Sequence, residues 1–391
     1  MMNMKKWLCV FLALALLLGA TGCAPEAASN TDPTETDTGK VEDPFAQPSE
    51  DPDAETSAVG DANQPFEQFF GFGWSTVEED VERGFDVNYV YDEKTTMQYR
   101  VYDGGEMRLP FYLLTQGYEA DGFGVLLFVD GLPQPYRMEG DTEYSYMHAF
   151  YPEDGEYYLD LYFIPVTGQA GDNLEVWALL VFGPECFPTK DNPYTRQYAM
   201  GSVMAEQRIQ FNAAPPAQEL PEASNRILSQ TVSYEDTSFS DISGWSVEDL
   251  QTKISSICTT PDMDDRTHMS RYDISADTPI QLRFEVYGSP LVDYRLVYFL
   301  DYVPVAVSIE DLAFIEIESG RKTIVETTVD LSGFDGYSIL FPVLVPVNRI
   351  LTDDGEVQAN TLYLRAQVPF QFILTAASDY QGMLDMNSNR R

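Results

Sequence analysis

Apolar and polar residues alternate along much of this chain. Within 280–286 and again within 157–163, every second residue is apolar, the period of a strand that buries one face. Two other runs, 125–129 and 296–300, are unbroken apolar segments, which are typical of central strands. No long segment has the 3.6-residue period of an amphipathic helix. The pattern therefore predicts a chain built mainly of short strands.

Turn residues separate the predicted strands and favour a particular architecture. They are Asp103-Gly104-Gly105, Asp130-Gly131, Gly171-Asp172-Asn173, Asp335-Gly336 and Asp354-Gly355. Two short helices are expected to start at Ser75 and Ser246, because Glu78 and Asp249 lie at capping-box spacing. Many short strands without helices between them predict an all-β fold of antiparallel β-sandwiches, immunoglobulin-like or jelly-roll in type.

The strand-rich region occurs twice in the sequence. Gly73-Trp74-Ser75 recurs as Gly244-Trp245-Ser246, an offset of 171 residues that also pairs Arg100 with Arg271 and Phe128 with Phe299. Towards the end of each copy the offset falls to 161, which aligns Ile209 with Phe370. A period this long indicates a duplicated domain rather than a solenoid repeat.

The duplication predicts the boundaries of the folded part. Sandwich domain 1 covers 66–213 and sandwich domain 2 covers 226–376. The Pro-rich segment 214–225 forms a hinge between the copies, and 377–391 forms a C-terminal tail.

The N-terminus carries an export signal, residues 1–22. Lys5 and Lys6 precede an apolar stretch of 12 residues, which is shorter than the roughly 20 residues that a membrane-spanning helix needs. The segment Ala20-Thr21-Gly22-Cys23 resembles the lipobox of bacterial lipoproteins. That resemblance implies cleavage before Cys23 and lipidation of its thiol, as by diacylglycerol or palmitate. The alternative is cleavage at the same small residues and secretion without lipid.

Residues 23–65 predict an acidic, disordered stalk. Positions 24–65 contain 11 Asp or Glu, one lysine and a single aromatic residue, Phe45. Such a segment buries too little apolar area to offset the entropy of ordering it. It would hold the folded part away from the membrane to which Cys23 is anchored.

Charge excludes some classes of partner. The 391 residues carry 63 acids against 23 Lys and Arg, a net charge of −40. A strong negative field repels phosphate, so we expect no nucleic-acid partner. Two histidines in the chain argue against multi-His metal sites, and we expect no cofactor and no metal.

The remaining cysteines leave two interpretations open. Cys186 and Cys258 stay in the exported part and occupy different positions in the two copies. Paired, they would form a disulfide between the domains, which an oxidising exterior permits. Unpaired, each is a small apolar residue, the interpretation that we prefer.

Clustered acids and tyrosines are the candidate binding residues. Asp262, Asp264 and Asp265 could ligate calcium, but the loop lacks the 12-residue calcium-loop pattern and favours a solvated acidic loop. Asp130 and Asp301 recur before the second strand of a hairpin, which is typical of turn residues. Copy one contains a candidate ligand face of five tyrosines, Tyr144, Tyr146, Tyr151, Tyr158 and Tyr162. The alternative for these tyrosines is packing in the core or across strands.

Motifs for catalysis are missing from the sequence. It contains no Gly-x-Ser-x-Gly, no His-Glu-x-x-His and no phosphate-binding glycine loop. We therefore expect a lipid-anchored extracytoplasmic protein that binds a carbohydrate or a peptide at the cell surface without being an enzyme. The alternatives are a structural spacer of an envelope complex and, third, a glycan-active hydrolase.

Overall fold

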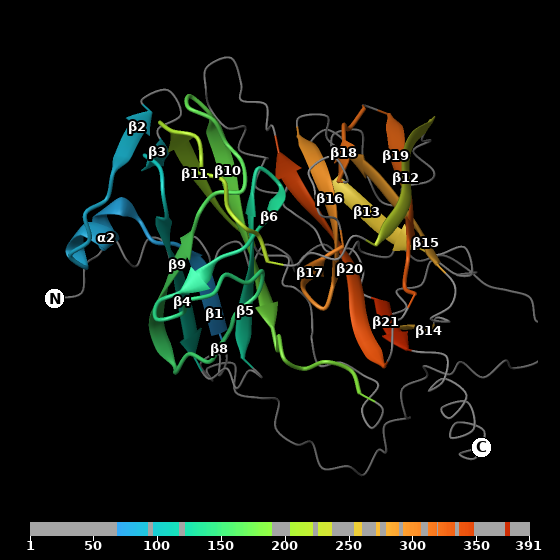
Figure 1. The fold of residues 1–391 in the computed structure, drawn as a ribbon, viewed down its shortest axis with the longest axis horizontal. Coiled ribbons are helices and arrows are strands. Elements are labelled where there is room, and N and C mark those ends of the chain that lie inside the picture. The colour runs from blue at the N-terminus through green and yellow to red at the C-terminus, as the bar shows by residue number, and fades with distance from the viewer. Residues whose placement is uncertain are drawn as a thin grey trace, which may run out of the picture. The chain divides into compact units, whose positions relative to one another are not determined.

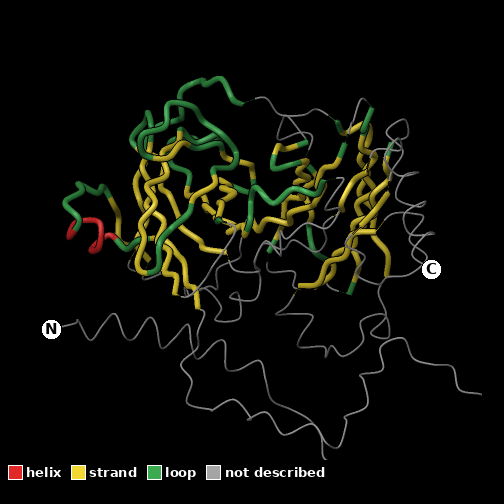
Figure 2. The backbone as a smooth tube through the Cα atoms, turned by 90° about the horizontal axis from the view of Figure 1, so that it is seen from below, coloured by secondary structure: helices red, strands yellow, loops and turns green. Residues whose placement is uncertain are grey.

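The protein folds almost entirely into strands. The computed structural model describes residues 69–92, 97–116, 122–189, 204–221, 226–236, 254–259, 271–273, 279–288, 292–305, 312–318, 320–332, 336–347 and 372–375. Figures 1 and 2 show these residues as paired strands with a single short helix. The described residues from Phe72 onward belong to one compact unit, Phe72–Arg391. The fold is all-β, as predicted.

Copy one is a sandwich of two sheets (Figure 1). The smaller sheet has the order β1 (Phe69–Trp74), β4 (Met107–Gln116), β9 (Gly155–Phe163) and β7 (Arg137–Met138). The larger sheet has the order β2 (Tyr89–Asp92), β3 (Met97–Tyr102), β11 (Met204–Phe211), β10 (Asn173–Phe182), β5 (Phe123–Val129) and β6 (Leu132–Gln134), with β8 (Ala149–Phe150) also on β5.

Copy two repeats the larger sheet of copy one and the central pair of its smaller sheet, whereas the edge strands of its smaller sheet come from different places along the chain. Its smaller sheet has the order β12 (Ile227–Asp236), β19 (Arg321–Val329), β15 (Ile280–Gly288) and β13 (Ile254–Thr259). Its larger sheet has the order β14 (Arg271–Asp273), β21 (Phe372–Thr375), β20 (Tyr337–Val347), β16 (Asp293–Leu300) and β17 (Val303–Pro304), with β18 (Ala313–Ile315) also on β16.

The alternating segments form strands with one buried face. On β15 the apolar residues Ile280, Leu282, Phe284 and Val286 are all at most 4% exposed, as the period of two predicts. On β9, Leu159, Leu161 and Phe163 are buried in the same way, whereas Tyr157, which the alternation placed on the same face, is 39% exposed. The prediction of one-sided strands is therefore confirmed at both places.

The unbroken apolar runs belong to strands that are buried on both faces. All of β5, which contains 125–129, is buried, and on β16, which contains 296–300, the residues from Leu296 to Phe299 are buried while Leu300 is partly exposed. The strand next to β16, β20, is buried at all but its first residue. One apolar cluster joins the two copies: Phe128 on β5 meets Phe299 on β16 edge to face, with ring centroids 5.9 Å apart. Each of these strands thus faces its own sandwich on one side and the other copy on the other side.

The repeated Asp130 and Asp301 each begin a two-residue hairpin turn, as predicted. Val129 pairs with Leu132, and Leu300 pairs with Val303, so that each turn contains two residues. Positive φ values at Asp130, Gly131, Asp301 and Tyr302 fit a type I′ turn. The carboxylates, however, do not bond locally: Asp301 Oδ1 accepts from the Ile339 amide at 2.8 Å, and Asp130 accepts from Arg295.

The first predicted helix starts one residue later than expected. Helix α2 spans Val77–Glu82, and Thr76 caps it through a reciprocal capping box with Glu79. Ser75 cannot serve as the cap because it is buried and donates instead to Asp80 Oδ1 at 3.0 Å. The second predicted start, Ser246, lies outside the described residues.

The last strands correct the predicted offset. In each copy the last strand runs parallel to an early strand: Ile209 lies opposite Arg100, and Ile373 lies opposite Arg271. The two copies are therefore separated by 164 residues at this point rather than by 161, and Ile209 corresponds to Ile373 instead of Phe370. A chance match of Gln-Phe pairs in the sequence produced the smaller offset.

Several predicted segments are outside the described residues. They include the export signal 1–22, the stalk 23–65 and the tail 377–391. Of the hinge 214–225, residues up to Pro221 are described, and Gln218 donates to the carbonyls of Ile164 and Pro165 in copy one. Within the described part of the chain, no helix is long and apolar enough to cross a bilayer.

Candidate functional site

The five candidate tyrosines do not form one exposed row. Tyr158 and Tyr162 lie on the outer face of β9, and Tyr144 donates to Glu106 near them at 2.6 Å. Tyr146 is buried at 8% exposure and belongs to the interior. Tyr151 is 60% exposed but lies elsewhere, where its hydroxyl bonds to Glu185.

Arginines lie over the tyrosine rings that share the outer face. The Arg83 guanidinium is 4.4 Å from the centroid of the Tyr158 ring, and that of Arg137 is 4.5 Å from the Tyr162 ring. Each contact is a cation–π interaction that covers one face of a tyrosine. These rings are therefore less available for stacking on a sugar than an uncovered platform would be.

Acids balance the arginines of the outer face. Arg137 forms a bidentate pair with Glu106, at 2.7 and 2.6 Å, and burial opposes but does not cancel the lowering of the Glu106 pKa by this pair. Arg108 donates to Asp160 Oδ1 at 2.7 Å. The outer face is thus a network of internal pairs that stabilises the sheet.

The centre of this network is a buried carboxylate on α2. Asp80 is fully buried and forms an ion pair with Arg100, whose Nη2 lies 2.7 Å from Asp80 Oδ2, while Arg83 Nη1 lies 3.5 Å from the other oxygen. Arg100 is itself only 3% exposed, and its Nη2 also donates to the Ser75 carbonyl at 2.9 Å. Burial lowers the pKa of Arg100, and Asp80 opposes that shift. The pair fixes α2 and the end of β1 onto the sandwich.

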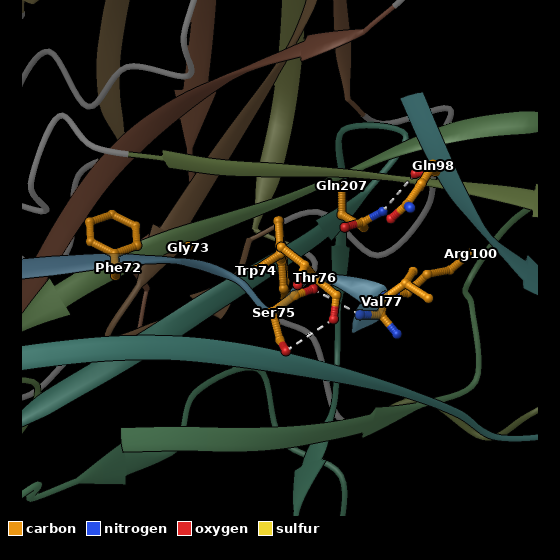
Figure 3. A pocket seen from close by; sticks show the side chains of 9 residues that line it. All are labelled: Phe72, Gly73, Trp74, Ser75, Thr76, Val77, Gln98, Arg100 and Gln207. Carbon is orange, nitrogen blue, oxygen red and sulfur yellow. Dashed lines mark hydrogen bonds between the residues drawn. The ribbon is translucent and has the colours of Figure 1, made fainter. Parts of the chain in front are cut away.

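A pocket opens beside this buried pair, between the ends of β1 and α2 and the strands β3 and β11 (Figure 3). Its volume is about 320 Å³, at the small end of the range for ligand sites. The lining residues are Phe72, Gly73, Trp74, Ser75, Thr76, Val77, Gln98, Arg100 and Gln207. No acidic side chain is among them, although acids are frequent in this chain.

Two N–H donors of this pocket have no acceptor. Arg100 Nε and Trp74 Nε1 are both buried atoms without a hydrogen-bond partner among the described residues. An unsatisfied buried donor costs about 1–3 kcal/mol, and most such groups in native proteins are paired. Both residues line the pocket, and a ligand acceptor that displaced the groups covering these N–H atoms would satisfy them.

Amide side chains form the opposite wall. Gln207 Nε2 donates to the backbone carbonyls of Gln98 and Arg208, at 3.5 and 3.3 Å, and Gln98 Nε2 donates to Glu78 at 3.2 Å. With both amide nitrogens engaged, the side-chain oxygens remain as acceptors on this wall. The wall is thus complementary to the donors of Trp74 and Arg100.

The sequence contained a signal for this site, but we interpreted it differently. Trp74 and Arg100 are both repeated at the 171-residue offset, as Trp245 and Arg271, and the repetition of the tryptophans is most simply explained by a shared place in the core. In copy one they line a pocket instead. The carboxylate Asp80 is not repeated, since copy two has Gln251 at that position. The side chains of Trp245 and Arg271 are outside the described residues.

The other candidate residues lie apart from the pocket. Cys258 is buried in copy two, where burial raises its pKa, and Cys186 follows β10 in copy one; no disulfide joins these two residues. The acidic residues Asp262, Asp264 and Asp265 and the lipid-attachment residue Cys23 are outside the described residues. Within the described ranges, no group of three or more His, Cys, Asp or Glu is placed to hold a metal ion.

Comparison with solved structures finds tandem β-modules. The chain is similar to the fibronectin(III)-like modules of Clostridium thermocellum CbhA, with 9% identity over 74% of this chain and 94% of that chain and a TM-score of 0.19. For the tandem Ig repeats of Dlar the identity is 7%, over 72% and 95% of the chains, with a TM-score of 0.17. For CBD12 of CALX1.2 the identity is 11%, over 71% of this chain and 96% of that chain, with a TM-score of 0.17.

No protein-family model matches the sequence, and no curated protein matches it. At TM-scores below 0.2 the similar structures carry no argument about function. The site is therefore interpreted from its own residues.

Proposed function

We propose that the protein is an extracytoplasmic, lipid-anchored binding protein that holds its ligand in the pocket of copy one. The observation that carries this proposal is a pair of buried donors, Arg100 Nε and Trp74 Nε1, which have no acceptor among the described residues and belong to two residues that line a pocket. Asp80 and Ser75 hold Arg100 in place. A site whose donors are fixed in advance loses little entropy when a ligand binds.

The lining residues support binding rather than catalysis. Ser75 donates to a carboxylate, Asp80, but the serine is buried and the carboxylate is already paired with Arg100. An ion-paired carboxylate is a poor general base because its partner stabilises the charged form. These groups therefore position Arg100 instead of activating the serine.

The anchor rests on the sequence at Cys23 and on the acidic stalk that follows it. Cells that express the protein would be labelled with a radioactive fatty acid, and the membrane fraction would be examined. We expect label on the wild type and none on Cys23→Ser, which should be released. Equal labelling of both proteins would contradict the anchor.

Ligand binding would be tested with a pocket-filling variant. Gln207→Trp adds bulk to one wall of the pocket, and Tyr162→Ala removes a ring from the outer face of β9. A library of soluble sugars and peptides would be screened by thermal shift on all three proteins. We expect ligands that raise the Tm of the wild type and of Tyr162→Ala but not of Gln207→Trp. Loss of binding only in Tyr162→Ala would move the site to the tyrosine face.

A second function, as a rigid spacer of an envelope complex, is favoured by the apolar cluster shared between the copies. Phe128, Trp177 and Leu179 of copy one share this cluster with Phe299, Phe341 and Val343 of copy two. A large apolar interface fixes two modules relative to each other. If the protein is only a spacer, no compound in the thermal-shift screen should raise its Tm.

A further inference from the structure

We propose that the ligand of the copy-one pocket is an uncharged saccharide. This inference rests on the proposed function and names the chemistry of its ligand. It follows from the hydrogen-bonding groups, the rings and the charge of the pocket.

Both donors and acceptors line the pocket. Trp74 Nε1 and Arg100 Nε each lack an acceptor, whereas the amide nitrogens of Gln98 and Gln207 are engaged as donors and their side-chain oxygens can each accept a hydrogen bond. A hydroxyl group donates and accepts at once, so a ligand with several hydroxyls can satisfy both walls. A purely accepting ligand, such as a carboxylate or a phosphate, would leave the glutamine oxygens unsatisfied.

Aromatic side chains complete the lining. Phe72 and Trp74 both pack against the buried Phe111, with ring centroids 5.6 and 5.5 Å away, so that their positions are fixed. The negative face of an aromatic ring attracts the polarised C–H groups on one side of a sugar ring. Fixed rings beside hydrogen-bonding groups are therefore complementary to the two kinds of surface that a sugar presents.

Charge argues against an acidic ligand. The positive charge of Arg100 is already neutralised by Asp80 at 2.7 Å, and Glu78 lies at the rim, where it accepts from Gln98. The whole chain carries −40. An anion entering the pocket would meet repulsion that no unpaired cation offsets, whereas an uncharged ligand would not.

A peptide fits this site less well. Extended peptides usually bind by adding a strand to a sheet edge, where they use free backbone groups. At the pocket end of β1, however, the Ser75 carbonyl already accepts from Arg100, and the Ser75 amide donates to Pro110 at 3.1 Å. At this end of β1 the pocket therefore offers side-chain groups, and the edge of β1 that faces away from β4 is the place where the peptide arm of the titration tests strand addition.

The test is a calorimetric titration of the folded exported protein. The uncharged ligands are cello-, malto-, xylo- and chito-oligosaccharides, and oligogalacturonate is their charged counterpart. A pool of uncharged peptides is titrated in the same way. Trp74→Phe keeps a ring and removes the N–H, and Trp177→Phe removes the indole of a residue in the cluster between the copies. We expect at least one uncharged saccharide to bind, about tenfold more weakly in Trp74→Phe and unchanged in Trp177→Phe. Circular dichroism would confirm that both variants are folded.

The other outcomes separate two failures. Binding of peptides or oligogalacturonate without any uncharged saccharide would overturn this inference and leave the proposed binding function in place. Saccharide binding that is equal in the wild type and Trp74→Phe, together with full binding by Gln207→Trp, would overturn the assignment to this pocket. Absence of any binding would overturn both proposals.

Discussion

At the scale of single residues, two equivalent turns carry different side chains. Both adopt type I′ geometry, but copy one has Gly131 where copy two has Tyr302, with φ values of 73° and 67°. This conformation is costly for a bulky residue. Tyr302 nevertheless is buried there and packs on Phe341 with ring centroids 5.9 Å apart. Its ring also packs on Phe187 of copy one, with ring centroids 5.8 Å apart, and these contacts offset the backbone strain.

Gly131 should tolerate no side chain. A Cβ at this position would lie 2.8 Å from Val347 Cγ1 and 3.0 Å from Arg295 Cδ, in addition to the strain of a positive φ. We expect Gly131→Ala to lower the free energy of unfolding by about 2–4 kcal/mol. The matched control is Gly140→Ala, which has a φ of 90° but nothing within 4 Å, and should cost about 1 kcal/mol. Equal costs in urea denaturation would contradict the close packing of this turn on copy two.

At the scale of elements, a six-residue helix depends on a buried ion pair. Helix α2 is too short to be stable by itself, and it is attached through its capping box and through Asp80. Asp80 also touches Arg83 and Arg108, at 3.5 and 3.9 Å. Asp80 therefore links α2 to strands of both sheets of copy one.

Removing the Asp80 charge should be strongly destabilising. Asp80→Asn leaves Arg100 buried without its closest anion, and we expect a loss of about 3–5 kcal/mol in the free energy of unfolding. The control is Glu106→Gln, whose partner Arg137 is more accessible, and which should cost about 1 kcal/mol or less. Comparable losses in chemical denaturation would show that the buried pair has no special role.

Elements that depend on local pattern could be predicted from the sequence, and elements that depend on tertiary contacts could not. Alternation in 280–286 and the Asp130-Gly131 turn were both predicted because each depends on neighbouring residues. The cap of α2 was displaced by one residue because Ser75 has a buried partner. Asp80 was one acid among 63, and only the approach of β3 distinguishes it.

The candidate site likewise depends on tertiary contacts that the sequence pattern did not reveal. The tyrosines were grouped by sequence, whereas the strand alternation of β9 and the packing of Tyr146 distribute them over different environments. The pocket residues come from four elements, β1, α2, β3 and β11, and no local pattern joins these. The repetition of Trp74 and Arg100 was the clue in the sequence, and burial of the indole in a core was a reasonable alternative for the tryptophan.

At the scale of the whole molecule, one apolar cluster belongs to both copies. Phe299 packs on Phe128 across the copies and stacks on Phe341 at 5.4 Å within its own sheet. Arg295 adds a polar contact, since its Nε donates to the Asp130 carbonyl at 2.9 Å. Sandwiches that share a core should unfold together.

Truncation of the shared core should separate the copies. We expect the wild type to show one thermal transition by calorimetry, and Phe299→Ala to lose about 3–5 kcal/mol and to show two transitions. Phe314→Ala, at a 40% exposed position, should change stability by about 1 kcal/mol or less and keep one transition. Two transitions in the wild type would contradict a cooperative pair.

Alkaline pH should weaken the whole fold. Burial raises the pKa of Tyr136, Tyr294 and Tyr298, all fully buried, above the ordinary value of about 10. Because the folded state then holds protons that the unfolded state releases, stability is fully present below pH ~10 and falls as pH rises through the raised pKa. Urea denaturation between pH 8 and 11.5 should show this fall, with tyrosinate absorbance appearing only on unfolding. A flat profile, or absorbance before unfolding, would contradict the burial of these hydroxyls.

The most direct measurement observes the indole N–H of Trp74 while ligand is added. The chain has four tryptophans, so ¹⁵N-tryptophan labelling gives few signals, and Trp74→Phe assigns the one from the pocket. During titration with the uncharged oligosaccharide that binds most tightly, the Trp74 signal should move saturably and downfield as its unpaired N–H gains an acceptor, while that of Trp177 stays in place. A Trp74 signal that stays fixed while the ligand saturates the protein would contradict binding in this pocket.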